Sequence, residues 1–256
     1  MLPPWPEVEL EEEEQETHEV EVPSGPTPAP PNEHVFVRVW IGVSGAMDFT
    51  VLPGGTDVCT RNADGSASDG NWSCTNDTPE GTDFPATKSE NASLVQGKAG
   101  SVTSGVQPAN VRVKATFDYA VTQNLLLGGA VGYVAGTYNG TITSHFVPMH
   151  LEVHGTWLFG TAPLSRVGFA PFVQLAGGVG EYDSNLTIMV EQNGVPGARP
   201  VQAWHVGGPG FVAFETGLRY AYSARAGLFL GARATAAFGT SFFPAFGPDI
   251  TLQIGF

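Results

Sequence analysis

From residue 34 onward, apolar residues alternate with small or polar ones in runs long enough to form strands. Alternation with a period of two places successive side chains on opposite faces of a strand. Polar stretches and turn-forming residues separate the runs. Eight runs are found, at residues 34–44, 111–121, 125–135, 147–159, 167–179, 212–220, 228–238 and 250–256. The pattern predicts an all-β fold of eight strands.

The last predicted strand ends the chain on an aromatic residue. Ile250, Leu252, Ile254 and Phe256 occupy alternate positions. A barrel in a membrane pairs its last strand with its first, and its lipid face must be apolar. This ending resembles the C-terminal insertion signal of Gram-negative outer-membrane barrels, in which Phe is usually last and apolar residues precede it at every second position. The resemblance implies that these four residues are the insertion signal and that the barrel-assembly machinery is a partner.

Composition agrees with such a barrel. Charged residues make up 14% of the chain, Gly occurs 33 times and mean hydropathy is close to zero. No apolar run approaches the ~20 residues that a membrane helix needs. Near-zero hydropathy is usual for soluble domains, but a membrane barrel has it too because each strand mixes lipid-facing and lumen-facing residues.

The net charge of −14 comes largely from the first 33 residues, which hold ten of the 25 acidic residues and no Lys or Arg. The remainder carries 15 acidic against 11 basic residues, so nucleic-acid binding is not expected. Residues 1–33 are predicted to be a disordered, acidic and Pro-rich linker in the periplasm. The start lacks the basic and apolar regions of a signal peptide, so an upstream export signal or periplasmic domain is expected.

Cys59 and Cys74 lie in a long polar stretch over residues 50–107. In an exported protein such a pair usually forms a disulfide that closes a surface loop, and we predict one here. A metal site built from two cysteines without a nearby His is not expected.

Connection lengths and aromatic positions add to the barrel prediction. Connections after the first, third, fifth and seventh predicted strands are longer or more polar than the rest, as in outer-membrane barrels with short periplasmic turns and long external loops. Aromatic residues gather near the predicted strand ends, as in membrane-interface girdles. They are Tyr119, Trp157, Phe159, Phe169, Tyr220 and Phe256 at the periplasmic side, and Phe146, Phe211, Phe238 and Phe242 at the external side.

Residues 34–256 therefore resemble the small eight-stranded outer-membrane barrels, the family that includes the OmpA-type membrane domain. The acidic, Pro-rich lead-in also resembles those of large barrel proteins of myxobacteria. The resemblance implies an antiparallel up-and-down transmembrane barrel in the outer membrane of a Gram-negative cell, with a periplasmic N-terminus.

Eight strands leave no open pore, so inward side chains fill the barrel. Charged groups among them must be paired, since an isolated buried charge is costly. The predicted lumen network comprises Arg38, Arg112, Lys114, Asp118, His150, Glu152, His154, Glu215, Arg219, Arg233 and Asp249. Within it, His150, Glu152 and His154 share one face of one strand. Ligands along a straight strand diverge, so a polar network is favoured there over a metal site.

The favoured function is non-enzymatic: a structural barrel or anchor that displays a disulfide-pinned external loop, with no cofactor. A lipid A-modifying acyltransferase or deacylase is the first alternative, for which Ser144 and His145 with Asp48 or Glu181 would be the candidate residues. The second is a narrow channel. The third is a soluble calyx-type carrier, which would have an apolar interior and a polar exterior.

Overall fold

The computed structural model describes residues 36–256 except 64–71, 78–80, 88–89, 91 and 141–146. The linker predicted over residues 1–33 lies outside the described residues, as does the Ser144–His145 pair. No helix in the described part of the chain is long and apolar enough to span a membrane.

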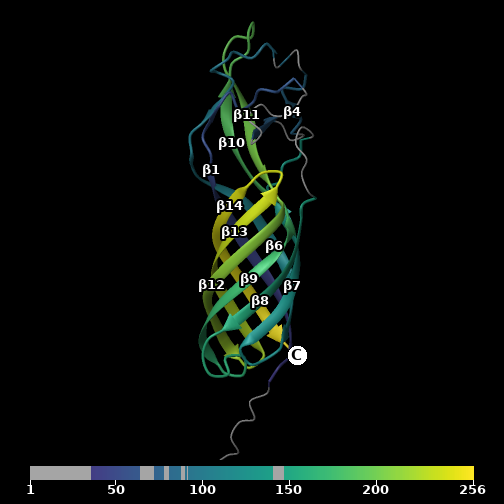
Figure 1. The fold of residues 1–256 in the computed structure, drawn as a ribbon, viewed down its shortest axis with the longest axis vertical. Helices are drawn as coiled ribbons and strands as arrows, with labels where there is room; N and C mark the ends of the chain where they lie inside the picture. Colours follow the sequence, from purple (N-terminus) through teal and green to yellow (C-terminus); the bar gives the residue numbers. More distant parts are fainter. Residues whose placement is uncertain (1–35, 64–71, 78–80, 88–89, 91, 141–146) are drawn as a thin grey trace, which may run out of the picture. The chain divides into compact units, whose positions relative to one another are not determined.

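A closed antiparallel barrel dominates the fold (Figure 1). Its eight strands follow one another around the barrel in chain order, which confirms the predicted up-and-down architecture. They are β1 (Val39–Leu52), β6 (Gly105–Ala120), β7 (Leu125–Ala135), β8 (Met149–Leu158), β9 (Gly168–Gly180), β12 (Pro209–Ser223), β13 (Ala226–Gly239) and β14 (Phe243–Gly255).

The terminal strand closes the barrel against the first strand, as the sequence predicts. Ile41 pairs with Ile254 and Val43 pairs with Leu252, and the amide N–H of Phe256 donates to the carbonyl of Val39 over 2.9 Å. Closure pairs every edge of the sheet, which removes the unpaired backbone groups that an open sheet would leave.

The two ends of the barrel differ. At the short-turn end, β1 begins, the chain ends, and the connections are residues 121–124, 159–167 and 224–225. At the long-connection end, the links are residues 53–104, 136–148, 181–208 and 240–242. The predicted alternation of connection lengths holds for the first three links, whereas the link after β13 is short.

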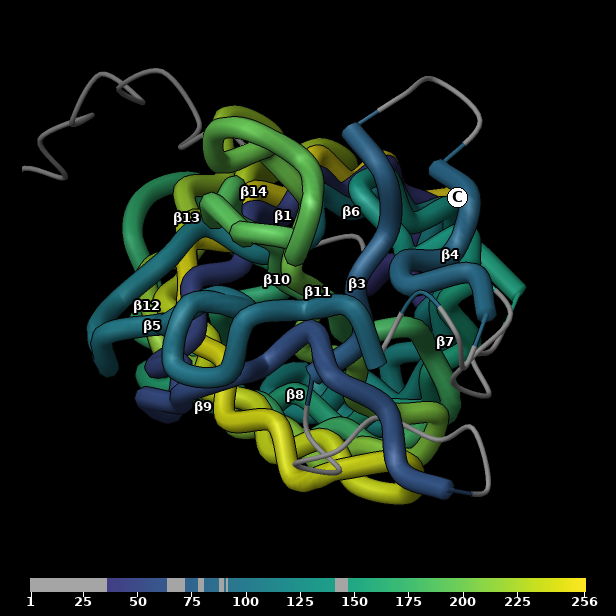
Figure 2. The backbone as a smooth tube through the Cα atoms, turned by 90° about the horizontal axis from the view of Figure 1, so that it is seen from above, coloured from purple at the N-terminus to yellow at the C-terminus, as the bar shows by residue number. Residues whose placement is uncertain are grey.

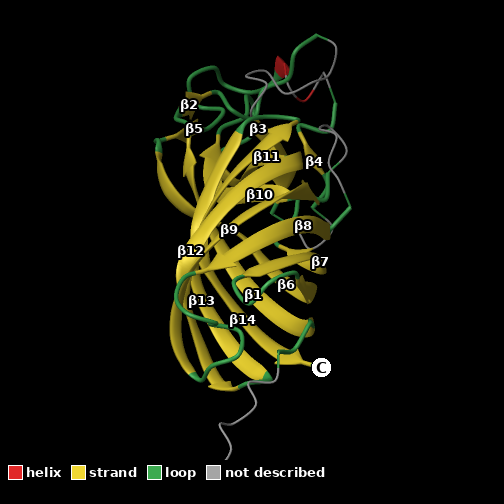
Figure 3. Cartoon of the chain, turned by 60° about the horizontal axis from the view of Figure 1, so that its bottom comes forward, coloured by secondary structure: helices red, strands yellow, loops and turns green. Residues whose placement is uncertain are grey.

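A second sheet continues the barrel at the long-connection end, where the sequence predicts only polar connections. Its order is β10 (Tyr182–Val190), β11 (Arg199–Gly207), β3 (Trp72–Asn76) and β4 (Asp83–Phe84). We call this sheet and residues 53–104 the cap. Figure 1 and Figure 3 show β10 and β11 rising from the barrel, and Figure 2 shows the cap strands in a view along the barrel. A pair of two-residue strands, β2 (Gly55–Thr56) and β5 (Ser101–Val102), completes it.

The cap has its own apolar core and the predicted disulfide. Cys59 and Cys74 are bonded and buried. The core around them consists of Leu52, Val58, Trp72, Phe84, Leu94, Ala99, Val102, Ile188, Val190, Val201 and Ala203. The disulfide therefore fastens β3 to the segment that follows β2, inside a packed core.

The outer wall of the barrel is apolar. Large side chains on the outward faces of the strands are mostly 40–75% exposed, and almost all of them are aliphatic or aromatic. They include Ile41, Val43, Val113, Phe117, Leu127, Val131, Leu151, Val153, Leu175, Phe214, Leu218, Leu230, Ile250, Leu252 and Ile254. Most of the predicted girdle aromatics are also exposed. Phe211 is an exception, because it is buried inside the barrel, and Phe146 lies outside the described residues.

Arg38 corrects the predicted lumen network. It is exposed, and its guanidinium donates to the Tyr119 hydroxyl over 2.9 Å. Residues 36–38 precede β1, so the strand alternation does not extend through them. Val37 turns inward instead, where its carbonyl accepts from the Trp40 indole over 3.2 Å.

Candidate functional site: the closed lumen

The lumen is filled in three layers, of which the first is an apolar plug at the short-turn end. Trp40, Leu126, Leu158 and Phe172 are almost completely buried there. Val37, Ala120, Leu164, Ala170 and Phe229 complete the plug. Arg219 crosses it, with its guanidinium over the Trp40 ring at 5.1 Å and donating to the Pro163 carbonyl over 2.9 Å. Large apolar side chains therefore pack against one another across the lumen at this level.

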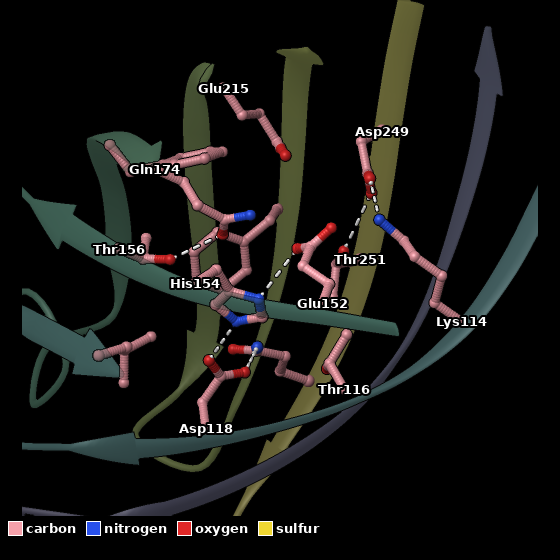
Figure 4. Close-up of a pocket in the computed structure, with 14 residues that line it drawn as sticks. Lys114, Thr116, Asp118, Glu152, His154, Thr156, Gln174, Glu215, Asp249 and Thr251 are labelled. Atoms are coloured by element: carbon pink, nitrogen blue, oxygen red, sulfur yellow. Dashed lines mark hydrogen bonds and ion pairs between the residues drawn. The ribbon is translucent and has the colours of Figure 1, made fainter. Parts of the chain in front are cut away.

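The second layer is a charged network centred on Glu152. Its carboxylate lies 2.9 Å from His150 Nε2 and 3.0 Å from His154 Nδ1. Arg233 donates to the same carboxylate over 2.6 Å and lies 3.9 Å from Glu215. Every member is buried or nearly so, and a buried carboxylate with several partners is held in one geometry. Figure 4 shows Glu152 and His154 facing one another inside the barrel.

The network reaches β6 and β14 through His154. Its Nε2 lies 2.7 Å from Asp118 Oδ1, and Gln253 donates to Asp118 Oδ2 over 2.7 Å. A chain of hydrogen bonds thus links β8, β6 and β14 across the lumen (Figure 4). These hydrogen bonds join strands that are far apart in sequence, as buried polar networks do.

Two more ion pairs occupy the lumen toward the long-connection end. Lys114 donates to Asp249 over 2.7 Å, and Ser44 donates to the second oxygen of that carboxylate over 2.5 Å. Arg112 pairs with Asp48 and donates to the carbonyl of Glu181 over 2.8 Å. The predicted lumen residues other than Arg38 are therefore brought together inside the barrel.

The third layer is a column of aromatic rings that leads from the lumen into the cap. Neighbouring ring centroids are 4.9–6.4 Å apart, within the range of favourable ring contacts. The column runs through His150, Phe211, Tyr182, Phe243, His205 and Trp72. Arg112 lies over the Tyr182 ring at 3.9 Å. Ring contacts therefore continue from the lumen to the edge of the cap core.

Little empty space remains in the charged layer. Glu152, His154, Asp118 and their neighbours enclose a cavity of about 20 Å³, which is close to the smallest volume that holds one water molecule. Among the described residues, no group of three or more His, Cys, Asp or Glu side chains is arranged to hold a metal ion. The geometry instead suits a rigid, charge-paired filling.

The lumen has several members that the sequence prediction omits. Asp48 is expected only at the external rim, and the predicted network lacks Ser44 and Gln253, yet all three are buried. A signal for all three exists. The alternation of β1 continues past residue 44 and places Ser44 and Asp48 on the inward face, and the alternation of β14 places Gln253 opposite its apolar face. Glu181, the second rim candidate, is also buried.

Comparisons with known proteins place the chain beside outer-membrane proteins at low similarity. No protein-family model matches, and no curated protein matches. Among solved structures, Neisserial surface protein A is 9% identical with a TM-score of 0.38, covering 85% of this chain and 97% of that one. The N-terminal β-barrel domain of Pseudomonas aeruginosa OprF is 8% identical with a TM-score of 0.35, covering 84% and 97%.

An outer-membrane channel from Pseudomonas putida F1 is 13% identical with a TM-score of 0.24, covering 89% of this chain and 100% of that one. At such identities and scores, no function passes from these proteins to this one.

Proposed function

We propose that this chain is an integral outer-membrane barrel with a closed lumen, which anchors and displays its cap on the external side. The observation that carries the proposal is the polarity of the barrel wall. Apolar side chains face out while the charged ones are buried inside, which is the reverse of a soluble calyx. A continuous apolar exterior of this size is stable in lipid and aggregates in water.

The filling of the lumen supports an anchor over a channel. Conduction needs a continuous lined path, whereas the apolar plug around Trp40 and Phe172 blocks one end and the aromatic column fills the opposite end. Between them, charged groups pair with one another and do not line open water. We therefore expect the folded protein to conduct no ions.

The cap supports display on the aqueous side of the membrane. Its sheet buries an apolar core of its own and has polar exposed positions such as Thr187 and Ser101. A disulfide holds it, and disulfides persist in oxidising compartments outside the cytosol. By the usual asymmetry of outer-membrane barrels, the cap faces the exterior and the short-turn end, where β1 begins, faces the periplasm. The myxobacterial resemblance of the linker remains a proposal from sequence.

The proposal is tested by refolding the full chain into detergent micelles and into phospholipid vesicles. A β-rich circular dichroism spectrum and a band that shifts on gels between unheated and boiled samples are expected, with neither obtained in plain buffer. Planar bilayers should record no step conductance after insertion. Clean folding in buffer without detergent would overturn the membrane assignment, and discrete conductance steps would overturn the closed lumen.

The terminal residues are proposed to act as the insertion signal. Phe256 is 70% exposed at the seam where β14 meets β1, so its ring is available for recognition before closure. Phe256→Ala is expected to lower the amount assembled in cells and leave refolding in detergent intact. Equal losses in both settings would mean that Phe256 only stabilises the barrel.

A further inference from the structure

A recess lies in the turn between β8 and β9, at the short-turn end of the barrel. It has a volume of about 200 Å³, and its lining includes Phe159, Thr161, Pro163, Arg166 and Phe169. The lining mixes one cation, a hydroxyl and aromatic rings, so the recess combines a charged contact with an apolar flank. This mixture suits an amphiphilic ligand.

The turn that forms the recess is held from several sides. The Asn124 side chain donates to the Gly160 carbonyl over 2.9 Å, and Arg219 donates to the Pro163 carbonyl over 2.9 Å. Leu164 is buried in the apolar plug, and its N–H donates to the Gln123 carbonyl over 3.3 Å. The walls are therefore fixed before any ligand arrives, which lowers the entropy cost of binding.

Arg166 is the charged group of this recess. It is exposed and makes no hydrogen bond or ion pair with any residue that the structure describes. The connections of the short-turn end, residues 121–124, 159–167 and 224–225, contain two arginines and no Asp or Glu. No neighbouring carboxylate in these turns competes for the guanidinium, which can bind the oxygens of a phosphate in a bidentate manner.

The surroundings place the recess at the height of lipid headgroups. Phe159 and Phe169 line it and are 47% and 75% exposed. Trp157 on β8 is 46% exposed, and the Tyr220 ring lies 4.8 Å from the ring of Phe169. Aromatic residues of this kind gather where the hydrocarbon meets the headgroups, so Arg166 would lie level with lipid phosphates.

The geometry points to a binding site for the headgroup of an anionic phospholipid, with its phosphate on Arg166 and its glycerol and upper acyl carbons against Phe159 and Phe169. The inference rests on the proposed membrane function. The ligand belongs to the leaflet at the short-turn end, which is the periplasmic one in the proposed orientation. Because the site has one recess and one cation, we expect each barrel to hold one lipid tightly, in addition to the loosely bound lipids that surround it.

The test uses the full chain refolded in detergent, with the shift between unheated and boiled gel samples recorded first. Short-chain phosphatidylglycerol and phosphatidylcholine are then titrated separately, and bound lipids are counted by native mass spectrometry. The wild type is expected to retain one phosphatidylglycerol. Arg166→Gln is expected to weaken that binding about tenfold, as the loss of a charge-assisted contact predicts.

Arg225→Gln is the matched control, because it removes the same charge from an exposed turn at the same end. It is expected to change binding less than twofold. Thr161→Trp fills the recess while it keeps Arg166, and is expected to weaken binding as Arg166→Gln does. Equal losses for Arg166→Gln and Arg225→Gln would reduce the effect to general surface charge and overturn the site.

Two further outcomes are decisive. If millimolar inorganic phosphate displaced the bound lipid as efficiently as added phosphatidylglycerol does, the site would be a simple anion site. If phosphatidylcholine bound as tightly as phosphatidylglycerol, the site would have no preference for anionic lipid. Either overturns the inference while the barrel stays heat-modifiable. Loss of the gel shift in the wild type would instead overturn the membrane barrel, so the two failures are distinguishable.

Discussion

The barrel and the cap are both built from antiparallel strands, but they bury opposite kinds of side chain. On β9, Leu175 points outward and is 67% exposed, while on β10, which follows at once, Val190 is completely buried. The barrel buries charges such as Glu152 and exposes aliphatic side chains, whereas the cap buries an apolar core and exposes polar groups. Under the proposed membrane function, this inversion marks the boundary between lipid and water.

The two regions also hold their charges differently. Ion pairs in the barrel are buried, such as Arg233 with Glu152. At the cap, Lys98 pairs at 3.1 Å with Glu191, the residue after β10, and the two side chains are 59% and 42% exposed. An exposed pair contributes little to stability, but breaking a buried one leaves an uncompensated charge. Equivalent substitutions should therefore have very different effects in the two regions.

The largest effect is expected from Arg233→Met. It leaves the buried carboxylates of Glu152 and Glu215 without their shared cation, which should lower the free energy of unfolding by about 3–5 kcal/mol. Urea denaturation in vesicles measures the change. Lys98→Met in the cap is the control, with an expected loss within about 1 kcal/mol. Similar losses for the two variants would contradict the difference between the regions.

The next effect concerns the outer wall. Val153, in the middle of β8, is 71% exposed, and Val153→Arg should destabilise the inserted barrel by about 2–4 kcal/mol because the charge enters lipid. Thr187→Arg, at an exposed position of the cap, should change stability by no more than about 0.5 kcal/mol. If Val153→Arg proves as harmless as Thr187→Arg in vesicles, the wall at this height faces water.

Removal of the disulfide should act on the cap alone. Cys59→Ser with Cys74→Ser opens a link with a sequence separation of 15, which is expected to cost the cap about 3 kcal/mol. Hydrogen exchange should rise in β3 and β11 and stay unchanged in β7 and β8. A barrel that loses its gel shift in this variant would show that the cap and the barrel unfold together.

The smallest effect is expected at Arg38, the residue that the sequence pattern wrongly assigns to the lumen. Because its side chain is exposed and, among the described residues, hydrogen-bonds only the Tyr119 hydroxyl, Arg38→Gln should lower the free energy of unfolding by less than about 1 kcal/mol. A decrease in the free energy of unfolding as large as that of Arg233→Met would mean that Arg38 belongs to the buried network after all.

The barrel strands are predictable because their signal is local. Alternation within β7 or β14 needs no knowledge of the partner strand, and the inward position of Arg112 or Glu152 follows from the same period. The alternation fails before β1, where Val37 and Arg38 lie outside the regular strand. There the inward turn of Val37 depends on its packing in the apolar plug, and the Trp40 indole donates to its carbonyl.

The cap is not predictable in the same way. Its strands are short, and β3 pairs with β11 across more than a hundred residues of sequence, as in Cys74 opposite Ala203. Pairing of this kind leaves little local trace. The three layers of the lumen are equally hidden, since the plug forms only when register brings Trp40, Phe172 and Phe229 to one height. Alternation places each of these side chains on the inward face, but they contact one another only once the barrel has closed.

The most direct test of the difference between barrel and cap is environment-sensitive fluorescence at one site on each. Val153→Cys and Thr187→Cys, each carrying a nitrobenzoxadiazole label on the protein in vesicles, report the medium around the wall and around the cap. We predict blue-shifted emission quenched by doxyl-labelled lipid at residue 153, and water-like emission quenched only by iodide at residue 187. Water-like emission at both sites would contradict a membrane boundary between the barrel and the cap.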